Sequence, residues 1–126
     1  MFHIHVGYTY PNVETSLALI KYLDIYLGIP SVVIDPDSKR RSLYGKAGCF
    51  RLTSYGFEYR TLSSAMMKDI KTLQFVWKQL MRAISAYEDE ECLMNSTKVQ
   101  NIINNSDVNA AKQAIEKYSL CADYLE

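Results

Sequence analysis

Two short segments of the chain alternate apolar side chains with side chains that carry chemistry. Residues 2–7 read FHIHVG and residues 57–60 read FEYR. Successive side chains of a β-strand point to opposite faces, so this period of two predicts strands whose polar side chains share one face. If both strands belong to one sheet, two imidazoles, the Glu58 carboxylate and the Arg60 guanidinium line a single surface.

A third strand is expected just before the second of these segments. The sequence TSYG at residues 53–56 separates apolar stretches near 48–53 and 57–62, which predicts a β-hairpin. The hairpin would bring Arg51 close to Glu58. Together with the strand near residues 2–7, it predicts a small antiparallel sheet.

The period changes to that of a helix in two long segments. Asn12 is a natural N-cap for a helix that we expect to end near Leu27, because Gly28 and Pro30 supply a stop. Residues 31–34 fit either a strand or a helical turn. A longer helix is predicted near residues 64–87, with a buried stripe of core or interface residues at spacings of three and four. That stripe comprises Met66, Ile70, Leu73, Trp77, Leu80, Ile84 and Tyr87.

The remaining chain is expected to be helical support. A short helix near residues 97–103 and a last helix through Tyr118 follow an acidic run at 88–91. These elements predict an α+β fold. A length of 126 residues suits one domain, 1–126, in which 1–64 carries the chemistry and 65–126 packs behind it.

The charge balance, the apolar runs and the cysteines indicate which classes of partner and which cell compartment the chain is suited to. The 14 basic and 14 acidic residues balance, so no global field favours nucleic acid or an anionic membrane. No leader sequence is recognisable, and no apolar run is expected to approach the roughly 20 residues of a membrane span. The three cysteines lie far apart and lack the paired spacing of zinc or redox sites, which favours reduced thiols and the cytoplasm.

A basic, glycine-containing segment precedes the predicted hairpin. Arg40, Arg41, Lys46 and Arg51 concentrate positive charge there, and two glycines flank the lysine. Backbone amides beside such side chains often hold phosphate or carboxylate oxygens. Taken alone, a turn and a solvated basic face explain the segment equally well, just as paired histidines on a strand are often structural.

The three motifs in this order resemble a known family. The sequence HxHVG at 3–7, RRxxYGKAGxFR at 40–51 and YGxEYRxLS at 55–63 is similar to the C-terminal half of phage-type carboxylate–amine ligases. These enzymes are distant members of the glutamine synthetase and glutamate–cysteine ligase superfamily. The resemblance covers about residues 2–64 and implies a truncated glutamine synthetase-like domain.

The resemblance implies metal and nucleotide roles for the two strands. By match, His3 and Glu58 would ligate a metal ion, with Glu58 bound to Mg²⁺, and His5 would lie near the nucleotide phosphates. The implied cofactors are therefore ATP and Mg²⁺. The isolated chain need bind neither of them.

The resemblance also implies roles for the basic residues. Arg60 would hold the carboxylate of an amino-acid substrate, and Lys46 belongs with the substrate-binding residues. Arg40, Arg41 and Arg51 would neutralise an acyl-phosphate and the transferred phosphoryl group. In this chemistry ATP phosphorylates a carboxylate, and an amine then displaces phosphate to form an amide.

The sequence departs from the family because it opens directly on the HxH strand. Two histidines and one glutamate make a poor magnesium site, since Mg²⁺ prefers carboxylate and phosphate oxygens. Three hypotheses follow: a ligase subunit completed by another polypeptide or a symmetry mate; a non-catalytic phage protein, such as an inhibitor of a host defence enzyme; or a remnant without independent function. The first two predict a homo-oligomer or a hetero-complex.

Overall fold

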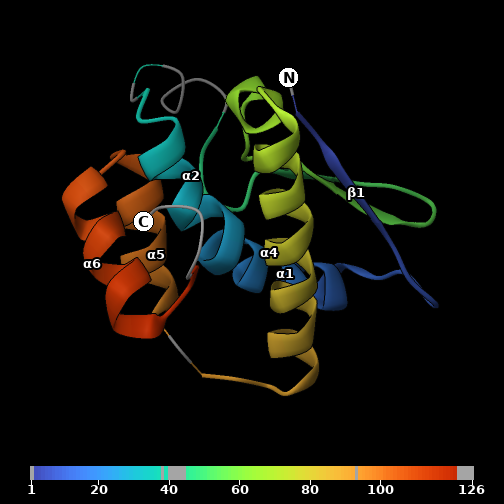
Figure 1. Cartoon of the computed structure of the whole chain (residues 1–126). Coiled ribbons are helices and arrows are strands. Elements are labelled where there is room, and N and C mark those ends of the chain that lie inside the picture. Colours follow the sequence, from blue (N-terminus) through green and yellow to red (C-terminus); the bar gives the residue numbers. More distant parts are fainter. Residues whose placement is uncertain (1, 38, 40–44, 93, 122–126) are drawn as a thin grey trace.

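The computed structural model describes residues 2–37, 39, 45–92 and 94–121 of the chain. Over these residues the protein has an α+β fold, with a three-stranded antiparallel sheet beside a body of helices (Figure 1). The fold class predicted from the sequence is confirmed.

The sheet consists of β1 (Ile4–Gly7), β2 (Phe50–Leu52) and β3 (Gly56–Tyr59), in the order β1-β3-β2. The predicted strand near 57–62 is too long at its end. After Tyr59, the Arg60 amide still donates to the Cys49 carbonyl at 2.8 Å, but Thr61 bonds to the Lys46 carbonyl through its hydroxyl, at 2.9 Å. A side chain thus replaces the backbone ladder there.

The register of the sheet separates an apolar row from a polar row. Ile4 and Phe50 both lie opposite Tyr59, and His5 and Arg51 both lie opposite Glu58. Tyr59 is fully buried, so the apolar row faces the helical body. The polar row therefore lies on the outer face, as the alternation in the sequence predicted.

One continuous helix forms the centre of the molecule. It comprises α1 (Val13–Leu23), a π-helical turn η1 (Asp24–Gly28) and α2 (Ile29–Ile34). The Asn12 side chain caps it as predicted. The predicted stop near Leu27 is wrong, because Gly28 has a right-handed helical backbone with φ −62° and the chain continues through Pro30.

The π-helical turn and a neighbouring helix accommodate the proline. Pro30 has no amide hydrogen for the carbonyl four residues before it, which belongs to Tyr26. The buried Gln79 side chain donates to that carbonyl instead, at 2.8 Å, and donates also to the Leu120 carbonyl at 2.7 Å. A residue far along the chain thus satisfies the acceptor that the proline leaves without its usual partner.

By length and composition, the helix Val13–Ile34 is apolar enough to cross a membrane. The expectation that no such run exists is wrong, because the helix continues through Gly28 and Pro30 to Ile34. Most of this helix is buried among the other elements, as in the core helix of a soluble protein, so it is weak support for a span.

The long helix is divided into a 3₁₀ turn η2 (Ser64–Met67), capped by Ser63, and α4 (Ile70–Glu88), capped by Asp69. Its predicted stripe is wrong in part, because Ile70, Leu73 and Trp77 are exposed. A mixed face of apolar, small and polar residues packs inward instead, close against α1 and η1. The buried residues of α4 are Thr72, Phe75, Val76, Gln79, Ala83 and Ala86.

Two helices complete the fold, α5 (Ser96–Asn104) and α6 (Val108–Tyr118), close to the predicted positions. They pack against α2 on the side away from the sheet (Figure 1). Arg82 of α4 donates to the carbonyls of Ser119 and Leu120, which fastens the end of α6 to the long helix.

Candidate functional site

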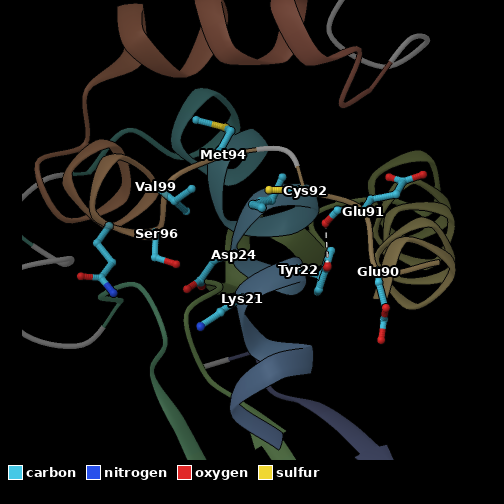
Figure 2. A pocket seen from close by; sticks show the side chains of 11 residues that line it. Lys21, Tyr22, Asp24, Glu90, Glu91, Cys92, Met94, Ser96 and Val99 are labelled. Atoms are coloured by element: carbon cyan, nitrogen blue, oxygen red, sulfur yellow. Dashed lines mark hydrogen bonds between the residues drawn. The ribbon is translucent and has the colours of Figure 1, made fainter. Parts of the chain in front are cut away.

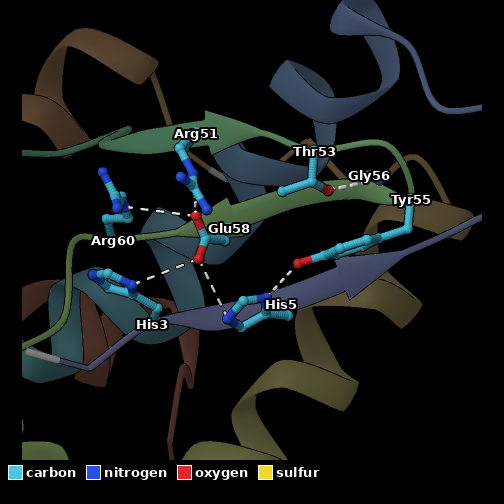
Figure 3. Close-up of polar contacts among 8 residues, drawn as sticks. All are labelled: His3, His5, Arg51, Thr53, Tyr55, Gly56, Glu58 and Arg60. Atoms are coloured by element: carbon cyan, nitrogen blue, oxygen red, sulfur yellow. Dashed lines mark hydrogen bonds and ion pairs between the residues drawn. The ribbon is translucent and has the colours of Figure 1, made fainter.

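The polar row of the sheet forms a cluster of charged and imidazole side chains on its outer face. His5, Glu58 and Arg51 lie side by side on β1, β3 and β2, and His3 and Arg60 lie beside this row (Figure 3). The structure therefore brings together five of the residues selected from the sequence. We call these five residues the sheet-face cluster.

The Glu58 carboxylate is the centre of the cluster and is only 4% exposed. Its Oε2 accepts a hydrogen bond from Arg51 Nε at 2.5 Å and lies 3.9 Å from Arg60 Nε. On the other side, Oε1 lies 3.4 Å from His5 Nε2 and 3.7 Å from His3 Nδ1. Each carboxylate oxygen is thus flanked by two nitrogen-bearing side chains.

These neighbours keep Glu58 ionised. Removal of the carboxylate from water favours the neutral acid and would raise its pKa. The hydrogen bond and charge of Arg51 favour the ionised form, and the charges of Arg60 and His5 favour it further. Together they outweigh the effect of burial, so the pKa of Glu58 lies below its ordinary value. The ionised cluster carries one carboxylate and two guanidinium groups, and it is net positive even when both imidazoles are neutral.

Two nitrogen atoms of the cluster have no hydrogen-bond partner in the part of the chain that the structure describes. His3 Nε2 and Arg60 Nε are buried, and neither makes a hydrogen bond to any described residue. Buried polar atoms in folded proteins are nearly always paired, so such atoms require an explanation. Arg60 Nε is a donor close to a site with excess positive charge, which is the environment that an anionic oxygen atom would enter.

Tyr55 is part of the site, although the sequence assigned it no role beyond the hairpin turn and the motif at 55–63. Its hydroxyl is hydrogen-bonded to His5 Nδ1, and the two rings are stacked with centroids 6.0 Å apart. An aromatic side chain in a tight hairpin turn directly beside a HxH strand was the available signal. Tyr55 orients the His5 ring and leaves Nε2 directed at Glu58.

The other predicted residues are not in the cluster. Lys46 is exposed in the segment before β2, and none of the contacts described for the cluster involves its side chain. Arg40 and Arg41 lie outside the described residues. Their predicted roles stay predictions.

A second buried carboxylate lies beneath the sheet, on its inner face. Asp24 Oδ1 accepts from the Tyr59 hydroxyl at 2.6 Å and from the Gly48 amide at 3.0 Å. Burial raises the pKa of Asp24 to about 6, and these two hydrogen bonds oppose the rise only in part. An acidic residue between Leu23 and Ile25 in an apolar helix was a signal that the sequence analysis did not use.

Asp24 also borders a hollow between the central helix and α5. This cavity has a volume of about 250 Å³, and its wall includes Lys21, Tyr22, Cys92 and Ser96 (Figure 2). None of the five residues of the sheet-face cluster lines it. The cluster lies on an open face of the sheet and not in an enclosed cavity.

The described residues do not fit a magnesium ion by themselves. Among them, no group of three His, Cys, Asp or Glu side chains is arranged to hold a metal. Glu58 is the single carboxylate of the cluster, and its Oε2 is already bonded to a guanidinium group. Mg²⁺ needs several oxygen ligands, so the cluster as described is suited to anions instead.

The comparisons with known proteins point to one family. A family model described as phage phiEco32-like COOH.NH2 ligase-type 2 matches residues 2–119. The match extends beyond the motifs at 2–64 and includes the helices α4, α5 and α6. No curated protein and no solved structure matches the chain.

Proposed function

The chain belongs to the family of phage phiEco32-like COOH.NH2 ligases of type 2, and we propose that its sheet-face cluster binds anionic oxygen atoms in a carboxylate–amine ligase site. The expected reaction is ATP-dependent formation of an amide bond. Because the reaction consumes ATP, we place the protein in the cytoplasm of the host cell.

The observation that carries this proposal is the unpartnered Arg60 Nε beside an ionised Glu58. Arg51 Nε is already bonded to the carboxylate at 2.5 Å, whereas Arg60 Nε lies 3.9 Å away and makes no hydrogen bond to a described residue. A phosphate or carboxylate oxygen would complete the coordination of Arg60. Arginine suits this role because its planar donors match such oxygens.

In this proposal, four residues of the sheet-face cluster have separate roles. Arg60 holds the carboxylate of the substrate, and Arg51 neutralises charge on the phosphoryl oxygens as they are transferred. Glu58 attracts both guanidinium groups to one oxygen and so holds them in place. His5, oriented by Tyr55, lies close to the phosphates. Charge stabilisation of this kind supplies much of the rate in phosphoryl and acyl transfer.

The site requires further groups from outside the described residues. The roles of His3 and Glu58 as metal ligands stay a proposal from the family, because the additional oxygen ligands are not among the described side chains. We propose that these ligands come from a second polypeptide. Arg40, Arg41 and Lys46 are the candidates within this chain for additional phosphate contacts.

Isothermal titration of the purified chain with ATP and MgCl₂, and with pyrophosphate alone, tests the proposal. We expect weak binding of both, which Arg60→Ala reduces at least tenfold because a charge-assisted hydrogen bond to an anion is lost. Glu58→Ala should abolish the ordered cluster and with it the binding of ATP.

The control variant is Lys112→Ala, which removes one exposed positive charge on α6, away from the sheet. It should bind as the unaltered chain does. Equal loss in Lys112→Ala and Arg60→Ala would show only non-specific attraction. No binding of any of the anions would overturn the proposed ligase site and favour the non-catalytic binding protein.

A further inference from the structure

The outward face of α4 carries large apolar side chains along most of its length. Ile70 is 74% exposed and Trp77 is 64% exposed, and Leu73 and Met81 are each about 40% exposed. Ile84, one helical turn further, is half-buried. These five residues, which we call the α4 stripe, recur at spacings of three and four and therefore lie on one side of the helix.

The α4 stripe is not needed to hold the helix in the fold. The opposite side of α4 packs on α1 and η1 through buried residues that include Phe75, Val76 and Ala83. In Figure 1 α4 runs along the outside of the molecule. Ile70, Leu73, Trp77 and Met81 are exposed, so no described element covers them. A contiguous apolar surface of this kind marks an interaction site.

Charge along α4 is divided between its two ends. Lys68 and Lys71 flank its start on either side of the N-cap Asp69, and Lys78 lies near its middle, whereas Glu88 and the residues after it, through Glu91, are acidic. All of these side chains are exposed. A partner helix that runs antiparallel to α4 would have to be acidic opposite the first end and basic opposite the second.

The α4 helix itself meets that requirement. We propose that the α4 stripe binds the α4 stripe of a second copy of this chain, with the helices antiparallel and the two-fold axis near Trp77. In this arrangement Ile70 of one copy lies near Ile84 of the other, and the lysines at each start approach the acidic end of the partner. A two-fold interface has this self-complementary form, and a parallel pair would place like charges together.

Sedimentation velocity over a range of concentrations tests the proposal. A single pair of helices buries less than a standard interface, so we expect a dimer with a dissociation constant on the order of micromolar. Trp77 is the one tryptophan of the chain, so its fluorescence emission should shift to shorter wavelength as the dimer forms. Trp77→Ala should weaken the dimer roughly 30-fold, as for a central aromatic anchor, and leave the circular dichroism unchanged.

Exchange of charges identifies a second copy as the partner. The pair Lys68→Glu and Lys71→Glu should weaken self-association about tenfold, and so should Glu88→Lys with Glu90→Lys. Mixing the two variants should restore a heterodimer, since each basic end then faces an acidic end again. Lys98→Glu with Lys112→Glu makes the same change of charge elsewhere and should leave the dimer intact.

Three results would overturn the proposal. One is a monomer at every concentration, with Trp77 emission typical of water, which would assign the stripe to a different partner. Another is a dimer that Trp77→Ala does not weaken. The third is a pair of charge variants that fail to associate when mixed although each is folded.

Discussion

Two buried carboxylates on opposite faces of β3 show how neighbours decide the state of a residue. Glu58 has guanidinium and imidazole groups around it, and its pKa is lowered although it is shielded from water. Among the described residues, the hydrogen-bond donors to Asp24 are a phenol and a backbone amide, and burial raises its pKa to about 6. The same chemical group is therefore held charged on the outer face and is readily protonated on the inner face.

This difference predicts how stability depends on pH. The pKa of Asp24 is about 6 in the folded protein, and the ordinary value is about 3.9 in an unfolded chain. At pH values between these two pKa values, Asp24 is protonated in the folded state and ionised in the unfolded chain. The free energy of unfolding therefore falls as pH rises from about 4 to about 6. The contribution lost above this range is on the order of 3 kcal/mol.

The variant Asp24→Asn isolates this effect. Its amide oxygen can accept the same two hydrogen bonds, but it does not ionise. We expect it to be more stable than the unaltered chain by up to roughly 3 kcal/mol at pH 7.5, and equal to it near pH 4. Urea unfolding at several pH values measures the difference, and a difference that is constant with pH would contradict the assignment.

At the scale of elements, the central helix depends on a contact that is remote in the sequence. The helix continues from η1 into α2 through Pro30, and Gln79 of α4 donates to the Tyr26 carbonyl, the acceptor that the proline cannot serve. Gln79 is 1% exposed, so water cannot replace it. The uninterrupted helix is therefore a property of the helix pair and not of the helix alone.

Replacement of Gln79 should expose this dependence. Gln79→Leu leaves the Tyr26 carbonyl without this donor, and we expect a loss of about 1–3 kcal/mol of stability. Pro30→Ala in the same background should recover part of the loss, because an alanine amide can donate to that carbonyl. Denaturant unfolding measures both variants.

The matched control for this prediction lies on the same helix. Gln74→Leu makes the identical change at an exposed position and should alter stability by less than about 0.5 kcal/mol. Equal effects of Gln74→Leu and Gln79→Leu would show that helix propensity, and not the buried hydrogen bond, explains the loss.

At the scale of the whole molecule, the two proposed functional surfaces lie on different elements. The sheet-face cluster is built from β1, β2, β3 and the residues next to them, whereas α4 packs on α1, η1 and η2. None of the five residues of the cluster lies on α4. Binding of an anion and pairing of two copies should therefore be separable.

The variant Trp77→Ala tests this separation. We expect its affinity for ATP with MgCl₂ to equal that of the unaltered chain in titration calorimetry, although its self-association is weakened. If Trp77→Ala also loses ATP binding, the second copy of this chain completes the site. The missing ligands would then come from that second copy and not from a different polypeptide.

Much of the sheet could be predicted, and much of the packing of the helices could not. The alternation around His5, Glu58 and Arg51 required one face for all three, because the period of a strand is fixed by its backbone geometry. In α4 the apolar residues also had a clear period, but the helix buries the opposite side. Periodicity shows that a helix has two sides, and it does not show which side the neighbouring elements cover.

The sequence by itself determined the positions of the strands, the cap at Asn12, the α+β class and the membership of the chain in its family, because each rests on local geometry or on motifs contiguous in the chain. The tertiary structure decided which nitrogen atoms surround Glu58. It decided that Tyr55 bonds to His5 and that Asp24 accepts from Tyr59, and that Pro30 does not end a helix. It also decided that Trp77 faces outward. These properties arise from contacts between residues far apart in the chain, which no local pattern specifies.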